Sequence, residues 1–276
     1  MAGAELMGLS ADRLRAQERQ AAAHANVVVV VSPQLAGHWA ALGSAPPVLI
    51  PNGSFPAYAG GVSPAPAVSD MPGPVVGLIG QLTPRVDLGL LTAVAEAGYS
   101  LLLVGPYDAR WEPEGFAALT ARPNVRYVGR VPAEAVPAYL ASIDVGLIPY
   151  TGSAFNRASF PMKTLEYFSA GLPVVSTDLP GSRWLRDSLA KLAAGHAAEL
   201  MALTSDAAEF VAAVQRLAGR PGSQAGPRAA TGSGAEPARS AAARRFADQH
   251  SWPRRADAFA EAIGLRTASP AHPATV

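Results

Sequence analysis

Cysteine is absent from the 276-residue chain, which excludes a disulfide framework, a thiolate metal site and a cysteine nucleophile. Charge is scarce as well, because only 16% of the residues are charged and the formal net charge is +1. Such a chain has no global field with which to attract nucleic acid or an anionic membrane. No apolar run approaches the roughly 18 residues of a membrane span, and residues 1–20 lack the apolar core of a signal peptide. We therefore expect a cytoplasmic protein with no nucleic-acid partner.

The chain is instead rich in apolar residues, which make up 49% of the sequence. This composition is typical of a compact globular protein rather than a disordered or coiled-coil one. The length suits one large domain or two small ones. The five histidines form no pair with metal-ligand spacing, and we expect no metal site.

Residues 1–55 contain signals for helices and two short strands. The run "NVVVVVS" has no alternation, which indicates a strand buried on both faces of a parallel sheet. A helix follows in "PQLAGHWAAL", with Ser32 as its N-cap, Pro33 at the first position and Gly43 as the stop. A second short strand lies in "PVLIPNG". The stretch after it is rich in proline, glycine and serine, so we predict a linker over residues 56–73.

From residue 74 onward, short apolar strands alternate with helices, beginning with "VVGLIG" and ending with "PVVST". This alternation predicts an α/β fold, a Rossmann-like doubly wound parallel sheet over residues 74–218. The stretch "AAELMALTSDAAEFVAAVQRLAG" is interpreted as further helix. We also predict a flexible linker over 219–240, a C-terminal helix over 241–265 and a disordered tail over 266–276. Ligands of such sheets bind where the strands end and their order reverses.

The loop "GQLTPRVD" follows the first strand of this sheet. Gly80 lets backbone approach a ligand closely, and Arg85 adds a fixed charge with forked donors. The helix that begins near Asp87 would aim free N–H groups at the same place, so the loop suits a phosphate. A tight turn with a solvated arginine is an equal alternative. The spacing is not G-x-G-x-x-G, so the fingerprint of a dinucleotide site is missing.

The stretch "FPMKTLEYFSAGLPVV" places Lys163 and Glu166 three residues apart on one face of a short helix. The lysine could neutralise phosphate oxygens, and the carboxylate could accept hydrogen bonds from both hydroxyls of a ribose. For an isolated helix, a surface ion pair is the better interpretation. The presence of Arg85 at the same predicted sheet edge favours the binding site.

The segment "FNRASFPMKTLEYFSAGLPVVST" resembles the donor-site signature of the retaining GT-B glycosyltransferases, in the family 4-like set known as glycosyl transferases group 1. "GLIGQLTPRVDLGLL", "LLLVGP", "NVRYVGRVPAEAVPAYLASIDVGLIPY" and "ARRFADQHSW" resemble other parts of that fold, in the same order. The resemblance covers most of residues 25–186 and 243–263. It implies that residues 1–55 are a remnant of an N-terminal acceptor domain and that residues 74–218 bind a nucleotide sugar.

The resemblance also implies roles for individual residues. Arg85 and Lys163 would be the catalytic cations that hold the diphosphate, and Glu166 would hold the ribose hydroxyls. Gly80 and Gln81 would border the donor, and the backbone around Val128 and Gly129 would border the base. No metal or other cofactor is then required, because side-chain cations stabilise the departing nucleoside diphosphate.

Two departures from the family pattern are visible. The family carries a second carboxylate eight positions before the ribose-binding glutamate, where this chain has Ala158, so Asn156 and Arg157 are the remaining candidates to hydrogen-bond a donor sugar. The N-terminal domain is reduced to its last helices and strands.

The resemblance implies a hexosyltransferase-type enzyme that moves a sugar from a UDP- or GDP-sugar to an unknown acceptor, in cell-surface polysaccharide or glycolipid synthesis. A lipid-linked acceptor would bring it to the inner membrane face. The alternative is a truncated, non-catalytic nucleotide-sugar-binding module that needs a separately encoded acceptor domain. A sugar-nucleotide epimerase of similar fold is disfavoured, because its acidic and histidine residues are missing.

Overall fold

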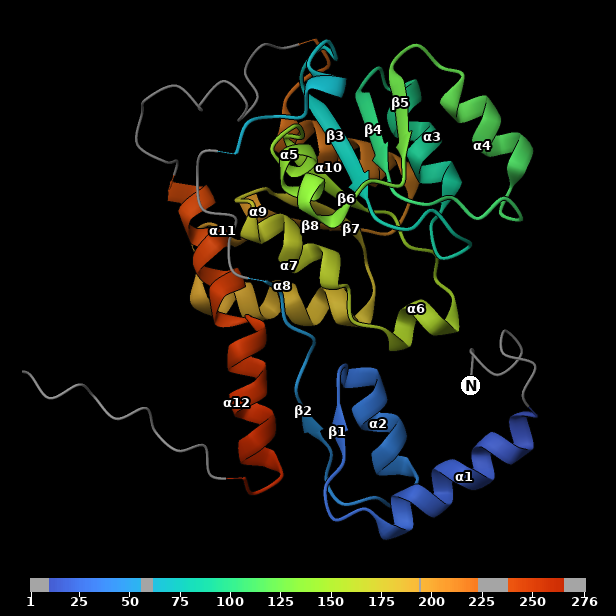
Figure 1. Cartoon of the computed structure of the whole chain (residues 1–276), viewed down its shortest axis with the longest axis vertical. Coiled ribbons are helices and arrows are strands. Elements are labelled where there is room, and N and C mark those ends of the chain that lie inside the picture. The colour runs from blue at the N-terminus through green and yellow to red at the C-terminus, as the bar shows by residue number, and fades with distance from the viewer. Residues whose placement is uncertain (1–9, 56–61, 194, 223–237, 266–276) are drawn as a thin grey trace, which may run out of the picture.

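A single parallel sheet dominates the computed structural model, which describes residues 10–55, 62–193, 195–222 and 238–265 (Figure 1). The strand order is β5-β4-β3-β6-β7-β8, and every neighbouring pair is parallel. The strands are β3 (Val75–Ile79), β4 (Ser100–Val104), β5 (Val125–Gly129), β6 (Val145–Ile148), β7 (Val174–Thr177) and β8 (Met201–Thr204). The order runs outward from β3 in one direction and from β6 in the other, so it reverses between these two strands. The predicted doubly wound α/β sheet is confirmed.

Helices cover both faces of the sheet, because its strands are apolar on both sides. One face packs against α3 (Leu88–Glu96), α4 (Pro113–Thr120) and α10 (Ala207–Ala218). The other face packs against α5 (Val136–Leu140), α7 (Met162–Ser169), α8 (Pro180–Leu192) and α11 (Ala238–Gln249). The two hydrophobic cores leave the carboxyl ends of the strands as the edge where polar groups can gather.

The stretch after residue 196 that was interpreted as further helix does contain helices, but it also contains a strand that the prediction missed. It folds as α9 (Ala197–Leu200), β8 and α10. The break is local, because the Asp206 side chain accepts a hydrogen bond from the backbone N–H of Glu209 and thereby caps α10. The residues before that cap, Met201–Thr204, pair with β7 as the edge of the sheet.

The N-terminal segment forms a small unit of its own below the sheet in Figure 1. Its elements are α1 (Ala11–His24), β1 (Val29–Val30), α2 (Pro33–Ala41) and β2 (Val48–Leu49), and the two strands pair in parallel. Ser32 caps α2 as predicted, accepting from the backbone N–H of Leu35 at 3.2 Å. The Ser32 hydroxyl also donates to the carbonyl of Ala158 at 2.5 Å, so this cap touches the larger unit.

Two chain segments run between the two units side by side. Ser54 on the first segment pairs with Ser251 on the second, and a Cβ added to Gly53 would lie 2.8 Å from the backbone nitrogen of Trp252. The predicted single C-terminal helix over 241–265 is therefore two helices, α11 and α12 (Trp252–Ala262). They separate at Ser251, which is extended, and Pro253 at the start of α12 cannot continue a helix from before it.

Part of the predicted linker over 56–73 packs on the large unit. Its described portion includes the 3-10 helix η2 (Pro66–Val68), whose Val68 is fully buried. The backbone N–H of Ala65 donates to the Ser142 hydroxyl at 2.9 Å. The predicted tail, residues 266–276, and residues 223–237 of the predicted linker over 219–240 lie outside the described residues.

Candidate functional site

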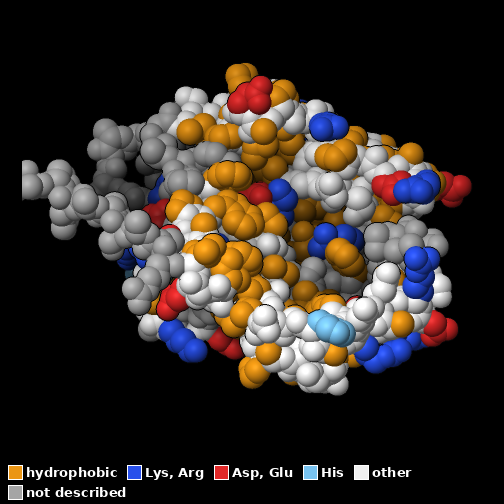
Figure 2. All heavy atoms as spheres, turned by 60° about the horizontal axis from the view of Figure 1, so that its bottom comes forward, with side chains coloured by type: hydrophobic (Ala, Val, Ile, Leu, Met, Phe, Trp, Pro, Cys, Tyr) orange, Lys and Arg blue, Asp and Glu red, His pale blue; other side chains and the backbone are white. Residues whose placement is uncertain are grey.

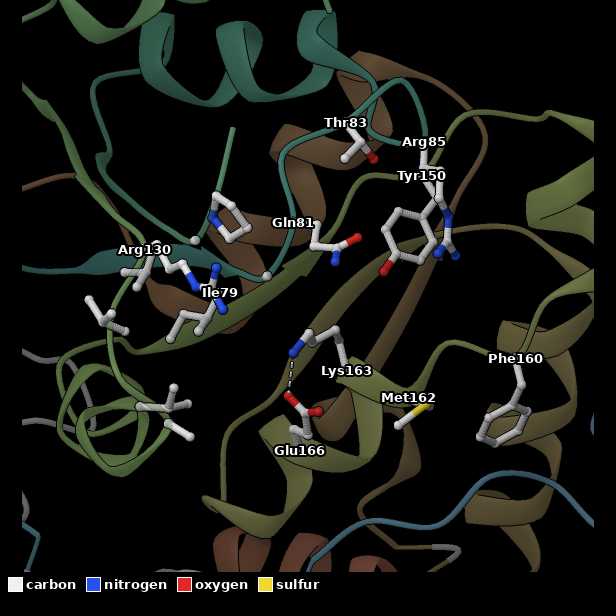
Figure 3. Close-up of a pocket in the computed structure, with 17 residues that line it drawn as sticks. Ile79, Gln81, Thr83, Arg85, Arg130, Tyr150, Phe160, Met162, Lys163 and Glu166 are labelled. Atoms are coloured by element: carbon white, nitrogen blue, oxygen red, sulfur yellow. Dashed lines mark hydrogen bonds and ion pairs between the residues drawn. The ribbon is translucent and has the colours of Figure 1, made fainter. Parts of the chain in front are cut away.

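A cleft of about 770 Å³ opens at the carboxyl ends of the strands, where the strand order reverses (Figure 3). That volume falls in the range of small-molecule sites. The cleft is lined by Ile79, Gly80, Gln81, Thr83, Arg85, Val104, Gly105, Pro106, Arg130, Val131, Ala133, Val136, Tyr150, Phe160, Met162, Lys163 and Glu166. Three of these side chains are cationic and one is a carboxylate, in a chain whose net charge is +1. The cleft thus concentrates positive charge, and Figure 2 shows Lys and Arg side chains within a hollow of the molecular surface.

Two glycines keep the cleft floor open where β3 and β4 end. Gly105 has φ +138, and a Cβ added to it would lie 1.8 Å from the carbonyl oxygen of Gly80. A Cβ added to Gly80 would lie 3.0 Å from Cε of Lys163. The strand ends therefore approach each other and Lys163 through bare backbone, which leaves room for a ligand directly above them.

Tyr167 on α7 holds β3 and β6 where they diverge. The two strands pair only at the start of β3, and the Tyr167 hydroxyl accepts a hydrogen bond from the backbone N–H of Ile79 at 3.0 Å. The ring passes over Gly146, where an added Cβ would lie 2.4 Å from it. Complete burial raises the pKa of Tyr167, so the hydroxyl stays protonated. It satisfies a backbone donor that the neighbouring strand no longer reaches.

Lys163 and Glu166 project from one face of α7 into the cleft (Figure 3). Nζ of Lys163 donates to Oε2 of Glu166 at 2.7 Å, and the side chains are 30% and 27% exposed. The ion pair considered from the sequence is present. It lies in the wall of the cleft rather than on the outer surface, so both groups can exchange this contact for a ligand.

Arg85, in the loop after β3, is half-buried and held by neutral groups. Its Nε donates to Oδ1 of Asn156 at 2.9 Å, and its Nη2 donates to the Ser159 hydroxyl at 3.4 Å. Its guanidinium carbon lies 5.1 Å from the ring centroid of Tyr150 and 4.6 Å from that of Phe155. Among the described residues no carboxylate pairs with Arg85. Its charge remains available to an anion.

The structure brings five of the nine predicted site residues to the cleft. They are Gly80, Gln81, Arg85, Lys163 and Glu166. Their presence in one cleft does not test the roles assigned to them. It does show that two stretches about 80 residues apart in sequence meet at one edge, as the parallel topology requires.

The remaining four do not line the cleft. Asn156 is 2% exposed and uses its amide within the protein, so it does not reach the position expected for a sugar contact. Arg157 is exposed, and its Nε donates to the carbonyl of Gly152. Val128 packs against the hydrophobic core, and the carbonyl of Gly129 accepts from the backbone N–H of Gly105 at 2.8 Å.

The first turn of α3 does not present its donors to the cleft. Asp87 is the N-cap, and its carboxylate accepts from the backbone N–H of Leu90 at 3.2 Å. Residues 87–90 do not line the cleft. That this helix contributes free N–H groups to a phosphate site stays a prediction. The positive charge of the cleft comes from side chains.

Sequence reasoning missed several cleft residues, and Arg130 is the most informative. It directly follows β5, is exposed, and is the third cation of the cleft (Figure 3). Tyr150 was missed in the same way, directly after Pro149 at the end of β6. Both could have been found by asking which side chain follows the end of each predicted strand.

Within the described ranges, no group of three histidine, cysteine, aspartate or glutamate residues is arranged to hold a metal ion. In the same ranges, every helix is too short or too polar to cross a membrane.

The chain is similar to several glycosyltransferases. TuaH of Bacillus subtilis (strain 168), a putative teichuronic acid biosynthesis glycosyltransferase, is 38% identical over 112 residues, which are 40% of this chain and 28% of TuaH. The match therefore spans little more than a quarter of that relative. The Anabaena protein Alr3699/HepE in complex with UDP has a TM-score of 0.68 at 18% identity, over 94% of this chain and 69% of that one. WaaG, a glycosyltransferase involved in lipopolysaccharide biosynthesis, has a TM-score of 0.59 at 17% identity, over 86% and 62% of the two chains.

At 17–18% identity the two structures show only that the fold is shared. The assignment of the chain to a family comes from a match to a family model. The model of the family described as "Glycosyl transferases group 1" matches residues 73–220, which include the whole six-stranded sheet and the cleft. Because this match covers more than half of the chain, the chain belongs to the glycosyl transferases group 1 family, whose fold is of the GT-B type.

Proposed function

We propose that the chain binds a nucleoside-diphosphate sugar in the cleft and transfers the sugar to an acceptor. The observation that carries the proposal is the charge arrangement at the point where the strand order reverses. Arg85, Arg130 and Lys163 line one cleft together with a single carboxylate, Glu166. A diphosphate requires cations, and a ribose is well held by a carboxylate that accepts from its two hydroxyls.

In this proposal Arg85 and Lys163 hold the diphosphate, and Glu166 holds the ribose. The ion pair between Lys163 and Glu166 opens when the donor enters: Lys163 moves to a phosphate oxygen, and Glu166 takes up the ribose hydroxyls. A side chain at position 80 would crowd Lys163, because an added Cβ would lie 3.0 Å from its Cε. When the bond from the sugar to the diphosphate breaks, negative charge grows on the leaving group, and the two cations stabilise it.

The donor we favour is a UDP- or GDP-sugar. Complexes of Alr3699/HepE with UDP, with UDP and glucose, and with UDP-glucose support a uridine nucleotide. For the acceptor we propose a growing cell-surface polysaccharide or glycolipid, which is supported by the similarity to TuaH, a putative teichuronic acid biosynthesis glycosyltransferase, and to WaaG, which is involved in lipopolysaccharide biosynthesis. We further propose that the transfer needs no metal or other cofactor, since the leaving group meets side-chain cations.

A thermal-shift titration tests donor binding. UDP or GDP should raise the melting temperature, and replacing both Lys163 and Glu166 by alanine should abolish the rise. The matched control is the double replacement of Arg186 and Asp187 by alanine, which removes an exposed ion pair of α8 outside the cleft. The control should retain the full shift. The titration should give the same result in EDTA and in Mg²⁺. No shift with any nucleoside diphosphate would overturn the proposal.

A second candidate is a nucleotide-sugar-binding module that does not catalyse transfer by itself and works with a separately encoded acceptor domain. The observation in its favour is the N-terminal unit, whose described sheet has only two strands, β1 and β2. Release of UDP from UDP-glucose, to water or to added glycolipid, discriminates the two candidates. Release above the background of the Lys163→Ala, Glu166→Ala variant supports transfer, whereas UDP binding without release supports the second candidate.

A further inference from the structure

Asn156 occupies an unusual position for a polar side chain next to a binding cleft. It lies on the five-residue helix α6 (Ala154–Ala158), is 2% exposed and does not line the cleft. All of its amide groups are nevertheless used, and two of its hydrogen bonds go to one residue, Arg85. We infer that Asn156 is a positioning residue that aims the Arg85 guanidinium into the cleft while leaving its charge free. The inference rests on the proposed function.

The hydrogen bonds fix Arg85 at both its backbone and its side chain. Oδ1 of Asn156 accepts from Nε of Arg85 at 2.9 Å, and Nδ2 donates to the carbonyl of Arg85 at 2.9 Å. Nδ2 also donates to the carbonyl and the hydroxyl of Thr151, each at 3.0 Å. Because Thr151 in turn donates its backbone N–H to the carbonyl of Arg85 at 2.9 Å, the loop after β3 and the loop after β6 form one connected network.

The aromatic neighbours limit the remaining freedom of the guanidinium. Tyr150 and Phe155 each lie within about 5 Å of its central carbon. Phe155 comes from α6, so the same short helix supplies both the amide and one of the rings. A guanidinium has five N–H donors, of which Nε–H goes to Asn156 and one Nη2–H goes to Ser159. The others can point into the cleft that Arg85 lines.

The neutrality of the amide is the second part of the inference. An aspartate at this position would pair with Arg85 and cancel the charge that an incoming diphosphate needs. It also could not donate to the carbonyls of Arg85 and Thr151. Lys163 provides the contrast, because its partner Glu166 is a carboxylate that must move away before the lysine can meet phosphate. An asparagine holds a cation ready without neutralising it, and ordering it in advance lowers the entropic cost of binding.

The experiment compares UDP with uridine, because the inference concerns the diphosphate alone. Affinities of the full chain for both are measured by calorimetry for the wild type, Asn156→Ala, Asn156→Asp, Arg85→Ala and the double variant Arg85→Ala, Asn156→Ala. The matched control is Ser182→Ala, which removes a buried hydroxyl whose hydrogen bond to Ser176 lies outside the cleft. It should lower the melting temperature and leave both affinities unchanged.

Asn156→Ala should weaken UDP binding roughly tenfold, the usual effect of losing a hydrogen bond to a charged group, and should change uridine binding less than twofold. Asn156→Asp should weaken UDP binding at least as much, although its side chain has the same size. In the Arg85→Ala background, Asn156→Ala should have no further effect on the ratio of UDP to uridine affinity. A structural role alone would lower both affinities together and would persist without Arg85.

The outcomes separate the inference from the proposed function. If wild type binds UDP more tightly than uridine and both Asn156 variants retain that difference, the inference is overturned and the proposed function stands. The inference is also overturned if Asn156→Ala lowers the UDP-to-uridine ratio as much without Arg85 as with it. If wild type binds neither UDP nor GDP, both are overturned.

Discussion

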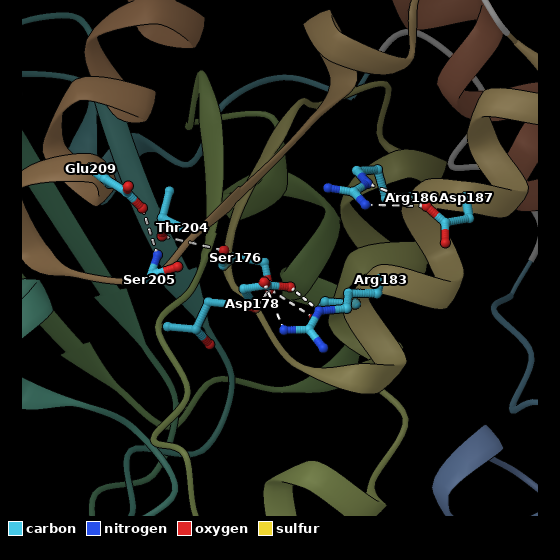
Figure 4. A network of polar contacts seen from close by, with 10 residues as sticks. Ser176, Asp178, Arg183, Arg186, Asp187, Thr204, Ser205 and Glu209 are labelled. Atoms are coloured by element: carbon cyan, nitrogen blue, oxygen red, sulfur yellow. Dashed lines mark hydrogen bonds and ion pairs between the residues drawn. The ribbon is translucent and has the colours of Figure 1, made fainter.

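Two arginines at the same edge of the sheet have opposite surroundings. Arg183, on α8 after β7, donates through Nε and Nη2 to both carboxylate oxygens of Asp178, at 2.6 and 2.9 Å (Figure 4). This contact raises the pKa of Arg183. Arg85, after β3, is held by an amide, a hydroxyl and two aromatic rings. One arginine has its counter-charge within the protein, whereas the other has only neutral partners.

The polar groups near Arg183 are bonded to one another, whereas Arg85 lies beside an open cleft. Above β7 and β8 the polar groups satisfy one another: Ser176 bonds to Ser182 at 2.9 Å, and Glu209 accepts from the backbone N–H of Ser205 at 2.8 Å (Figure 4). Above β3, β4 and β6 the edge is hollow. All parallel strands end at this edge, so topology alone does not select the site. The two arginines differ in whether a carboxylate of the protein already neutralises them: Asp178 pairs with Arg183, whereas among the described residues no carboxylate pairs with Arg85.

The largest effect is expected from removing the arginine in the cleft. Arg85→Ala should lower the rate of UDP release from UDP-glucose roughly 10²- to 10³-fold, as is usual when a group that stabilises developing charge is lost. Arg183→Ala is the matched variant above β7, outside the cleft, and should change the rate less than about twofold. Steady-state measurement of both variants tests the comparison. Equal losses of rate in the two variants would contradict the comparison, because an arginine outside the cleft would then matter as much as Arg85.

The next prediction concerns the opening between β3 and β6. Tyr167→Phe should destabilise the fold by about 1–3 kcal/mol, because it leaves the buried N–H of Ile79 without an acceptor. The melting temperature should fall by about 2–4 °C for each kcal/mol. Tyr139→Phe is the control, since Tyr139 is also buried but its hydroxyl makes no hydrogen bond within the described residues. An equal loss of stability in Tyr139→Phe would contradict the role assigned to the Tyr167 hydroxyl.

A third arginine, Arg255, also has a neutral partner, but it lies outside the cleft. It therefore sharpens the comparison. Arg255 on α12 donates to Nδ1 of His250 where α11 and α12 meet. Burial and the nearby Arg255 lower the pKa of His250 from 6.5 to about 4. In the unfolded chain His250 is protonated below about pH 6.5, whereas in the folded chain it is protonated only below about pH 4. Stability should be fully present above pH 6.5 and should fall as the pH drops toward 4.

Chemical denaturation between pH 7 and pH 4 measures that slope. His250→Gln should flatten the part of it that belongs to this histidine, while the carboxylates contribute equally to both proteins. Nucleotide affinity should be unchanged at pH 7, since His250 and Arg255 do not line the cleft. An identical slope in the variant would contradict the assignment.

The smallest effect is expected from Asp178→Asn. The Arg183 side chain is 56% exposed and that of Asp178 is 29% exposed, so solvent screens the pair and its loss should cost about 1 kcal/mol or less in the free energy of unfolding. The variant also gives Arg183 a neutral partner like that of Arg85. It should gain no measurable affinity for UDP, because neither residue lines the cleft. A gain would mean that a free charge at this edge is sufficient without a cleft.

Much of the fold could be predicted from local signals. The leucine-rich runs became strands and Ser32 became the cap of α2, because burial of a continuous apolar run and capping depend mainly on neighbours in sequence. The valine run predicted as a strand buried on both faces became a strand only at Val29–Val30, in a two-stranded sheet, and Val27 is 39% exposed. The short strand β8 was missed for the complementary reason. Four residues between two helices carry a weak periodic signal, and pairing with β7 decides their conformation.

The candidate site divides in the same way. The sequence by itself determined that Gly80, Arg85, Lys163 and Glu166 follow strands or begin helices, and parallel topology then sends them to one edge. Only the tertiary structure decided that Arg130 completes the cleft. It also decided that Asn156 is buried against Arg85, because a hydrogen bond between residues 71 positions apart in sequence depends on which strands become neighbours. The sequence determines which charged side chains are present. Packing determines which of them pair with an opposite charge within the protein.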